Sequence, residues 1–227
     1  CEVLSHGRRH RYLQAHHLAA DASAGDEEVV VEAGHVFHGE SHGTLAGDEY
    51  ELAGSGHTER VTLTGTDEAG DGAVAVEISE KLDEAVDGET GVLRPAAPAL
   101  LDEVVGVREE FDALGYDPET FVFPYDAADP RAWRLASEEY DAIANAAVRS
   151  LPNPPGTPPT NYRRYYLETT HSRPAEIETY LDHVAAQGGV GILAGHSAWD
   201  SVPPERVAFV IEAARERGIE VTTFADR

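Results

Sequence analysis

RRYYLETTHSRPAEIETYLDHVAAQGGVGILAGHSAWDSVPPERVAFVIEAARERGIEVTTF (163–224) is the stretch of sequence that decides the fold class. Short apolar runs predict strands over 163–170, 189–196 and 219–224, and amphipathic segments predict helices over 172–187 and 201–218. Within the first helix, Ile177, Leu181 and Val184 recur at helical spacing, and Gly218 ends the second helix. This alternation indicates βα units around a parallel sheet.

The residues upstream of this stretch continue the pattern. TFVFPY (120–125) predicts a further strand, and the helix after it has Asp129 as its N-cap and Pro130 at its first position. LLDEVVGVREEFDALG (100–115) predicts another helix. LPNPPGTPPTN (151–161) is expected to be an extended, rigid loop, since a residue before proline avoids helical backbone angles.

Residues 22–95 break the alternation. Their β-rich pieces are separated by Gly, Asp and Ser, and helical periodicity is weak throughout. We therefore expect a small antiparallel β insert that emerges from one loop of the α/β body.

Composition restricts the classes of partner. The 227 residues include 42 acidic and 17 basic ones, for a formal charge of −25, and Lys81 is the only lysine. An acidic surplus spread along the chain is typical of a halophilic protein, because salt screens its self-repulsion. Nucleic acid is not expected as a partner, since phosphate binding needs a basic face. There is no apolar run of about 18 residues, so we expect no membrane span.

Two histidine pairs share one spacing: His6 with His10, and His38 with His42. His6 follows the apolar run EVLS, which predicts that the first pair lies at the C-terminal end of a strand, where sites form in open sheets and barrels. Neutral imidazoles at such a place suit a metal such as zinc. The second pair lies in the Gly-rich insert, where we expect solvated surface residues.

Three segments in chain order extend this hypothesis: SHGRRH (5–10), FVFPYDA (121–127) and GILAGH (191–196). Together they resemble the polysaccharide deacetylase family, carbohydrate esterase family 4, whose NodB-homology domain is a distorted (β/α)7 barrel. The resemblance covers residues 1–17 and 98–227. It implies an α/β fold over 1–227, a partial NodB-type barrel with the antiparallel β-rich insert at 22–95.

The resemblance also implies a function, the metal-dependent removal of N-acetyl groups from amino sugars of a glycan. By the family's pattern, His6 and His10 bind a divalent metal, which we expect to be zinc. His196 protonates the departing amine, and the backbone N–H of Tyr125 contributes to the oxyanion site. Pro124 and Trp199 are expected to contact the sugar, Trp199 because aromatic faces suit pyranose rings.

The family's first motif, an Asp-Asp pair that provides the base and an acidic ligand, has no counterpart here. The sequence starts within a predicted strand and has no Met, so we expect an N-terminally truncated barrel that is inactive alone. Three carboxylates near the motifs are expected to be helix caps or surface groups rather than replacements: Asp126, Asp129 and Asp200. His171 and His183 are expected to lie outside the site.

Geometry gives this interpretation a test, because His6, His10 and His196 should converge at one barrel mouth beside Pro124 and Tyr125. Two alternatives remain open. One is a glycan-binding module that keeps the barrel without turnover. The other is a cupin-like metal site in the insert, built from His35, His38, His42, His57 and Glu49.

Overall fold

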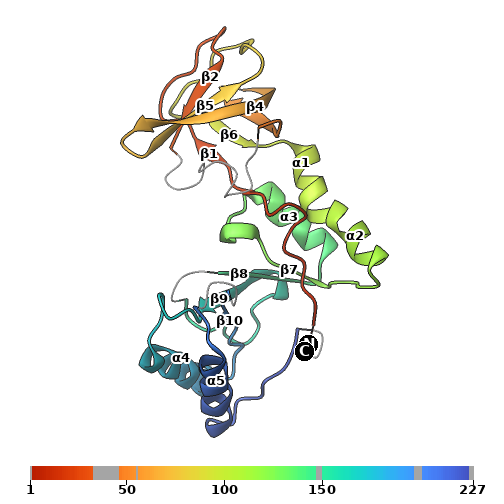
Figure 1. Ribbon diagram of the computed structural model, residues 1–227, viewed down its shortest axis with the longest axis vertical. Helices are drawn as coiled ribbons and strands as arrows, with labels where there is room; N and C mark the ends of the chain where they lie inside the picture. The colour runs from red at the N-terminus through yellow and green to blue at the C-terminus, as the bar shows by residue number, and fades with distance from the viewer. Residues whose placement is uncertain (1, 33–45, 55, 147–149, 197–200, 225–227) are drawn as a thin grey trace. The chain divides into compact units, whose positions relative to one another are not determined.

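The computed structural model describes residues 2–32, 46–54, 56–146, 150–196 and 201–224, and the chain has a mixed α/β fold (Figure 1). It divides into two compact units. The first, called here the α/β unit, comprises Cys1–Ser5, Asp117–Val122 and Tyr140–Arg227. The second, the β unit, comprises His6–Tyr116 and Phe123–Glu139.

Six strands make one sheet of the β unit, and every neighbouring pair in it is antiparallel. In the spatial order of the sheet they are β1 (His16–His17), β6 (Val92–Pro95), β3 (Glu49–Gly54), β4 (His57–Gly70), β5 (Ala73–Ile78) and β2 (Glu28–Val31). The prediction of antiparallel β structure between residues 22 and 95 is confirmed for the described strands, and β1 adds a strand upstream of that range.

Alternating side chains of these strands form the core of the β unit. In β2, Val29 and Val31 are buried while Glu28 is exposed, which is the period of two that a strand with one buried face requires. The sheet curls, and the N–H of Ala19 donates to the carbonyl of Val30, at 2.8 Å, beside the bridge between Leu18 and Val31. These contacts join the two edges of the sheet and cover backbone groups that an open edge would expose.

Helical segments of the β unit follow β6. They are α1 (Ala97–Leu101), a π-helical turn (Asp102–Gly106), α2 (Val107–Ala113) and, after a 3₁₀ turn at Pro124–Asp126, α3 (Pro130–Glu139). The predicted N-cap at Asp129 is confirmed, because its carboxylate accepts the N–H groups of Arg131 and Ala132 at 2.8 and 2.9 Å.

The α/β unit contains a parallel sheet in the order β10 (Leu193–Ala194), β9 (Tyr162–Tyr166), β8 (Ala142–Ala146) and β7 (Thr120–Phe121). Its helices are α4 (Pro174–Gln187) and α5 (Pro204–Glu216), which lie side by side (Figure 1). Both helices begin with proline, and Gly188 ends α4 in the left-handed conformation that glycine adopts most easily. The predicted βα alternation of this region is therefore confirmed in outline.

Four predicted strands differ from the structure. Those expected over 120–125, 163–170 and 189–196 shorten to β7, β9 and β10. Turns follow β7 and β9, whereas upstream of β10 Val190 pairs with Asn153 in an isolated antiparallel bridge. The strand predicted over 219–224 is wrong, since the described residues there have no strand pairing. Its first residue, Ile219, donates its N–H to the carbonyl of Ala214 and packs against the core beside α5. Ile219 is therefore bonded to the end of α5 rather than to a neighbouring strand.

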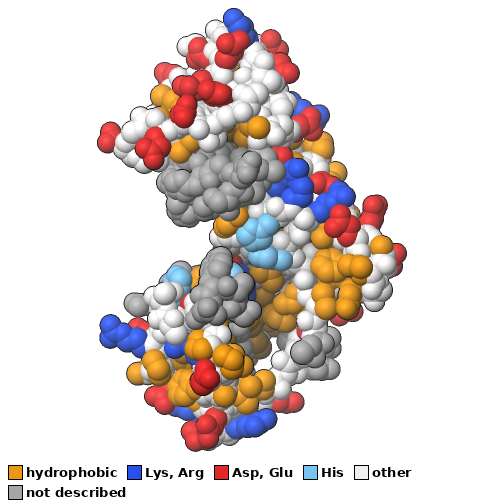
Figure 2. All heavy atoms as spheres, viewed as in Figure 1, with side chains coloured by type: hydrophobic (Ala, Val, Ile, Leu, Met, Phe, Trp, Pro, Cys, Tyr) orange, Lys and Arg blue, Asp and Glu red, His pale blue; other side chains and the backbone are white. Residues whose placement is uncertain are grey.

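The surface carries the acidic surplus that the sequence predicts. Figure 2 shows acidic side chains scattered over the visible face of the described residues, with fewer basic ones among them. No helix in the described part of the chain is long and apolar enough to cross a membrane.

Protonation of His16 is expected to make the stability of the β unit depend on pH. His16 is buried and stacks on Tyr12, with ring centroids 5.1 Å apart, and burial, aided by His17, lowers its pKa to about 4. The unfolded chain binds a proton below about pH 6.5, whereas the folded chain does not until about pH 4. The stabilisation is therefore complete above about pH 6.5 and is lost as the pH falls toward 4.

The expected loss of unfolding free energy at about pH 5 is about 2 kcal/mol, measured by denaturant unfolding at constant salt. His16→Phe keeps an aromatic ring against Tyr12 without a titrating group, so its stability should fall less over the same pH range. Equal losses in the two proteins would contradict the assignment.

Candidate metal centre

His6 and His10 lie together at the start of the β unit. Their Nε2 atoms are 3.1 Å apart, and their ring centroids are 4.7 Å apart in an edge-to-face arrangement. His10 is exposed to solvent and His6 is half-buried. The pair therefore presents two imidazole nitrogens to one small, accessible volume.

This spacing is close to that of two ligands of one metal ion. Nitrogen atoms about 2.0–2.1 Å from a tetrahedral zinc are about 3.3–3.4 Å from each other. Nε2 atoms at 3.1 Å need only a small ring movement to reach that separation. The two histidines that the sequence pairs therefore lie close enough to share one ion, and their binding of a metal stays a prediction.

Tyr125 completes a chain of rings with the histidine pair. Its hydroxyl oxygen lies 2.9 Å from Nδ1 of His10, and the two rings meet edge to face. A partner at Nδ1 fixes the orientation of an imidazole. Burial raises the pKa of the Tyr125 phenol, which therefore stays neutral near pH 7.

The backbone at two of these residues is unusual. His10 has φ = 58° and Tyr125 has φ = 56°, in the left-handed region that non-glycine residues seldom adopt. Strain of this kind persists only where surrounding contacts hold it, and it clusters at functional sites. Both strained residues belong to the same pair of facing rings, which supports a functional assignment for it.

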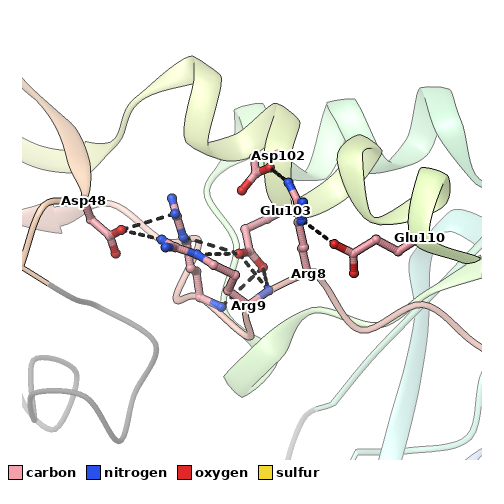
Figure 3. Close-up of polar contacts among 7 residues, drawn as sticks. Arg8, Arg9, Asp48, Asp102, Glu103 and Glu110 are labelled. Atoms are coloured by element: carbon pink, nitrogen blue, oxygen red, sulfur yellow. Dashed lines mark hydrogen bonds and ion pairs between the residues drawn. The ribbon is translucent and has the colours of Figure 1, made fainter.

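An ion-pair network surrounds the backbone next to His10 (Figure 3). Its centre is the buried carboxylate of Glu103, which accepts the N–H of Arg9 through both oxygens, at 3.0 and 3.1 Å. The guanidinium of Arg11 lies 3.3 Å from the same carboxylate and 3.2 Å from Asp48. Burial raises the pKa of Glu103, and the backbone N–H groups of Arg9 and Arg8 oppose that effect.

A third histidine, His196, has a carboxylate partner within the α/β unit. Nδ1 of His196 lies 2.6 Å from Oε1 of Glu168, and the same oxygen accepts the backbone N–H of His196 at 3.2 Å. Glu168 is buried, whereas the imidazole of His196 is exposed. This is the arrangement of a general acid or base, in which a buried carboxylate orients an accessible imidazole.

The turn that carries Glu168 is held by a buried arginine. The guanidinium of Arg206, at the start of α5, donates to the carbonyl of Leu167, and also to the carbonyl and hydroxyl of Ser172. These bonds tie the residue before Glu168 to the end of the turn. The other carboxylate oxygen of Glu168 faces Nδ1 of His171, at 3.6 Å. His171 was expected to lie outside the site, and here it lies near the carboxylate oxygen other than the one that contacts His196.

The structure brings together four of the site residues that the sequence predicts: His6, His10, Pro124 and Tyr125 all belong to the β unit. Pro124 is buried next to the histidine loop, since a Cβ at Gly7 would lie 3.3 Å from its Cγ. His196 belongs to the α/β unit, so its convergence with the pair stays a prediction. Trp199, Asp200, His38 and His42 lie outside the described residues.

The described residues contain no group of three or more His, Cys, Asp or Glu side chains arranged to hold a metal ion. They also do not favour the cupin-like alternative. Glu49 pairs with Thr62 and His57 with Gly54, at opposite ends of the β3–β4 hairpin, which separates them by about 17 Å along the strands. His57 instead faces Glu59 and Glu84, at 3.7 and 3.8 Å.

Comparisons with known proteins leave the family open: no protein-family model matches the chain, and no match was found among curated proteins. The resemblance to polysaccharide deacetylases therefore depends on the motifs and on the geometry given above.

Sequence reasoning missed two carboxylates, Glu103 and Glu168. Glu103 carried a signal, because it lies on the apolar face of its helix, three residues after Leu100 and four before Val107. An acid at such a position predicts a buried charge with a specific partner. Glu168 follows the strand β9 directly, but nothing local to it indicates that His196 is its partner.

Proposed function

We propose that this chain belongs to a metal-dependent hydrolase that removes N-acetyl groups from amino sugars of a polysaccharide or related glycan. In this proposal its parallel strands are part of a NodB-type (β/α)7 barrel, with the antiparallel sheet as the insert. The observation that carries the proposal is the position of His10, which contacts both His6 and Tyr125. The motif resemblance predicted these three residues as neighbours, although 115 positions separate His10 from Tyr125.

His6 and His10 fit a divalent metal, because their Nε2 atoms face each other at 3.1 Å and zinc binds neutral imidazole. When bound, such an ion polarises the acetyl carbonyl and lowers the pKa of a water molecule. Tyr125 orients His10 through Nδ1, and Pro124 packs under the loop that carries the pair. A third ligand and the base are assigned to the family's Asp-Asp motif.

His196 takes the part of the acid that protonates the departing amine. Glu168 holds Nδ1 of His196, and Nε2 is the nitrogen proposed to face the substrate. Protonation of the amine nitrogen turns a poor leaving group into a good one, and the carboxylate of Glu168 orients the imidazole that gives the proton. Trp199 is proposed as the stacking surface for the sugar ring.

Release of acetate from N-acetylated chitooligosaccharide tests the proposal. We expect the protein that includes the Asp-Asp motif to release acetate in high salt, to lose this activity on treatment with a chelator, and to regain it with Zn²⁺. Activity that a chelator leaves unchanged would contradict the metal-dependent mechanism. Saturable binding of the oligosaccharide without acetate release, with zinc present, would instead favour the glycan-binding module.

A further inference from the structure

We propose that Glu103 is the positioning residue of the His6–His10 pair: its buried carboxylate holds the loop that carries both imidazoles in the conformation that brings them together. This inference rests on the proposed metal site and adds to it a residue that no motif includes. Glu103 contacts neither imidazole, and it acts through the backbone on both sides of His10.

Backbone hydrogen bonds are the first support. Glu103 accepts the N–H of Arg9 with both oxygens, at 3.0 and 3.1 Å, and the N–H of Arg11 at 3.4 Å. These residues flank His10, whose φ of 58° requires a fixed backbone. A carboxylate that collects successive N–H groups stabilises a turn of this kind in the way a bound anion does. The contacts thus supply the restraint that holds His10 in its strained conformation.

Close packing of the loop against the carboxylate is the second support. Gly7 lies between the two histidines and has φ = +78°. A Cβ placed on it would lie 2.8 Å from Oε2 of Glu103, shorter than contacts that a side chain tolerates. The loop therefore approaches Glu103 as closely as its backbone allows, and glycine at position 7 makes this possible.

The helix that carries Glu103 departs from α-helical geometry at this residue. Glu103 lies in the π-helical turn Asp102–Gly106, between α1 and α2. Such turns are rare and occur frequently at functional sites, where the extra residue redirects a side chain. Figure 3 shows the Glu103 side chain pointing from this helix toward Arg9, away from the contacts that Asp102 and Glu110 make with Arg8.

The charge of the carboxylate is compensated locally, which explains how it is held while fully buried. The guanidinium groups of Arg9 and Arg11 lie 4.0 and 3.3 Å from Oε1, and both also contact Asp48. A buried carboxylate with two arginines and three N–H contacts is costly to disturb, because removing one partner leaves the others unpaired. The network is therefore rigid enough to position a neighbouring site.

Zinc titration of matched variants tests the inference. Glu103→Gln keeps the size of the side chain but replaces one acceptor oxygen with a donor NH₂ that faces N–H groups. We expect its Zn²⁺ affinity, measured by calorimetry near neutral pH, to fall about tenfold or more, the range found when an outer partner of a metal ligand is lost. Glu109→Gln is the matched control, since Glu109 is an exposed acid of α2, which follows the turn that carries Glu103. Its affinity should equal that of the wild type.

A structural readout separates positioning from general loss of stability. The ¹⁵N shifts of the imidazoles, measured without metal, should change for His6 and His10 in Glu103→Gln and stay constant for His16. If Glu103→Gln does not fold, Glu103→Asp keeps the charge while moving it back from the N–H groups, and it should show the same loss of affinity. In the wild type, hydrogen exchange at the amides of Arg9 and Arg11 should be slow.

The outcomes distinguish this inference from the proposed function. If the wild type binds zinc, His10→Asn does not, and Glu103→Gln binds as tightly as the wild type, the positioning role is overturned and the metal site stands. Unprotected amides at Arg9 and Arg11 would overturn it as well. If His10→Asn binds zinc as the wild type does, the metal site itself fails, whatever the Glu103 variants show.

Discussion

Replacement of His10 by asparagine is expected to weaken Zn²⁺ binding by about 100-fold or more. Its Nε2 faces that of His6 at 3.1 Å, so its removal leaves one imidazole where two were placed. Zinc sites depend on the number of nitrogen and sulfur ligands, and a lone surface imidazole binds weakly. Asparagine suits the backbone here, because it tolerates the positive φ of His10 better than alanine does.

His17→Asn is the control for this substitution. His17 is also exposed, on β1 of the same unit, so its loss changes the surface histidine content equally. Calorimetric titration of the two variants and the wild type should show loss of affinity for His10→Asn alone. Equal affinities in all three proteins would mean that zinc binds elsewhere among the 11 histidines.

Substitution of Glu168 by glutamine is expected to lower the rate of acetate release by about 10²–10⁴-fold in the active protein, while zinc affinity is unchanged. The Glu168 carboxylate lies 2.6 Å from Nδ1 of His196 and orients the imidazole. Glutamine has nearly the same shape, but it replaces an acceptor oxygen with an NH₂ group that favours the wrong tautomer of His196. The effect should therefore be on kcat rather than on metal binding.

Glu178→Gln gives the matched control, since Glu178 is an exposed residue of α4 in the same unit. Its rate of acetate release should equal that of the wild type across the pH range. If Glu168→Gln kept the full rate and the same pH profile, His196 would not be the acid, and the dyad would be a structural contact.

Sequence patterns predicted the elements whose cause is local. The helix after Asp129 and the two helices of the α/β unit are set by caps, prolines and apolar spacing, and all three are found. The strand predicted over 219–224 failed for a non-local reason. A strand exists only where a neighbour pairs with it, and none pairs with the described residues of this run. Its first residue, Ile219, packs beside α5, whereas Val221 is exposed.

The residues of the candidate site also divide into those that local motifs predicted and those that depend on distant partners. His6, His10 and Tyr125 were identified from short motifs, and their contact needed only that two loops meet. Glu103 and Glu168 act through partners 94 and 28 positions away, which spacing along one segment does not reveal. Of these two carboxylates, only Glu103 had a local indication in the sequence, its position on the apolar face of its helix.

Zinc K-edge X-ray absorption of the zinc-loaded protein is the most direct measurement of the central claim, that His6 and His10 hold one metal ion. The account predicts a shell that includes two imidazole nitrogens at about 2.0–2.1 Å, with the outer-shell scattering typical of histidine rings. In the His6→Ala/His10→Asn double variant both imidazoles should disappear from the spectrum. A shell of oxygen atoms alone in the wild type, or an unchanged spectrum in the double variant, would contradict the account.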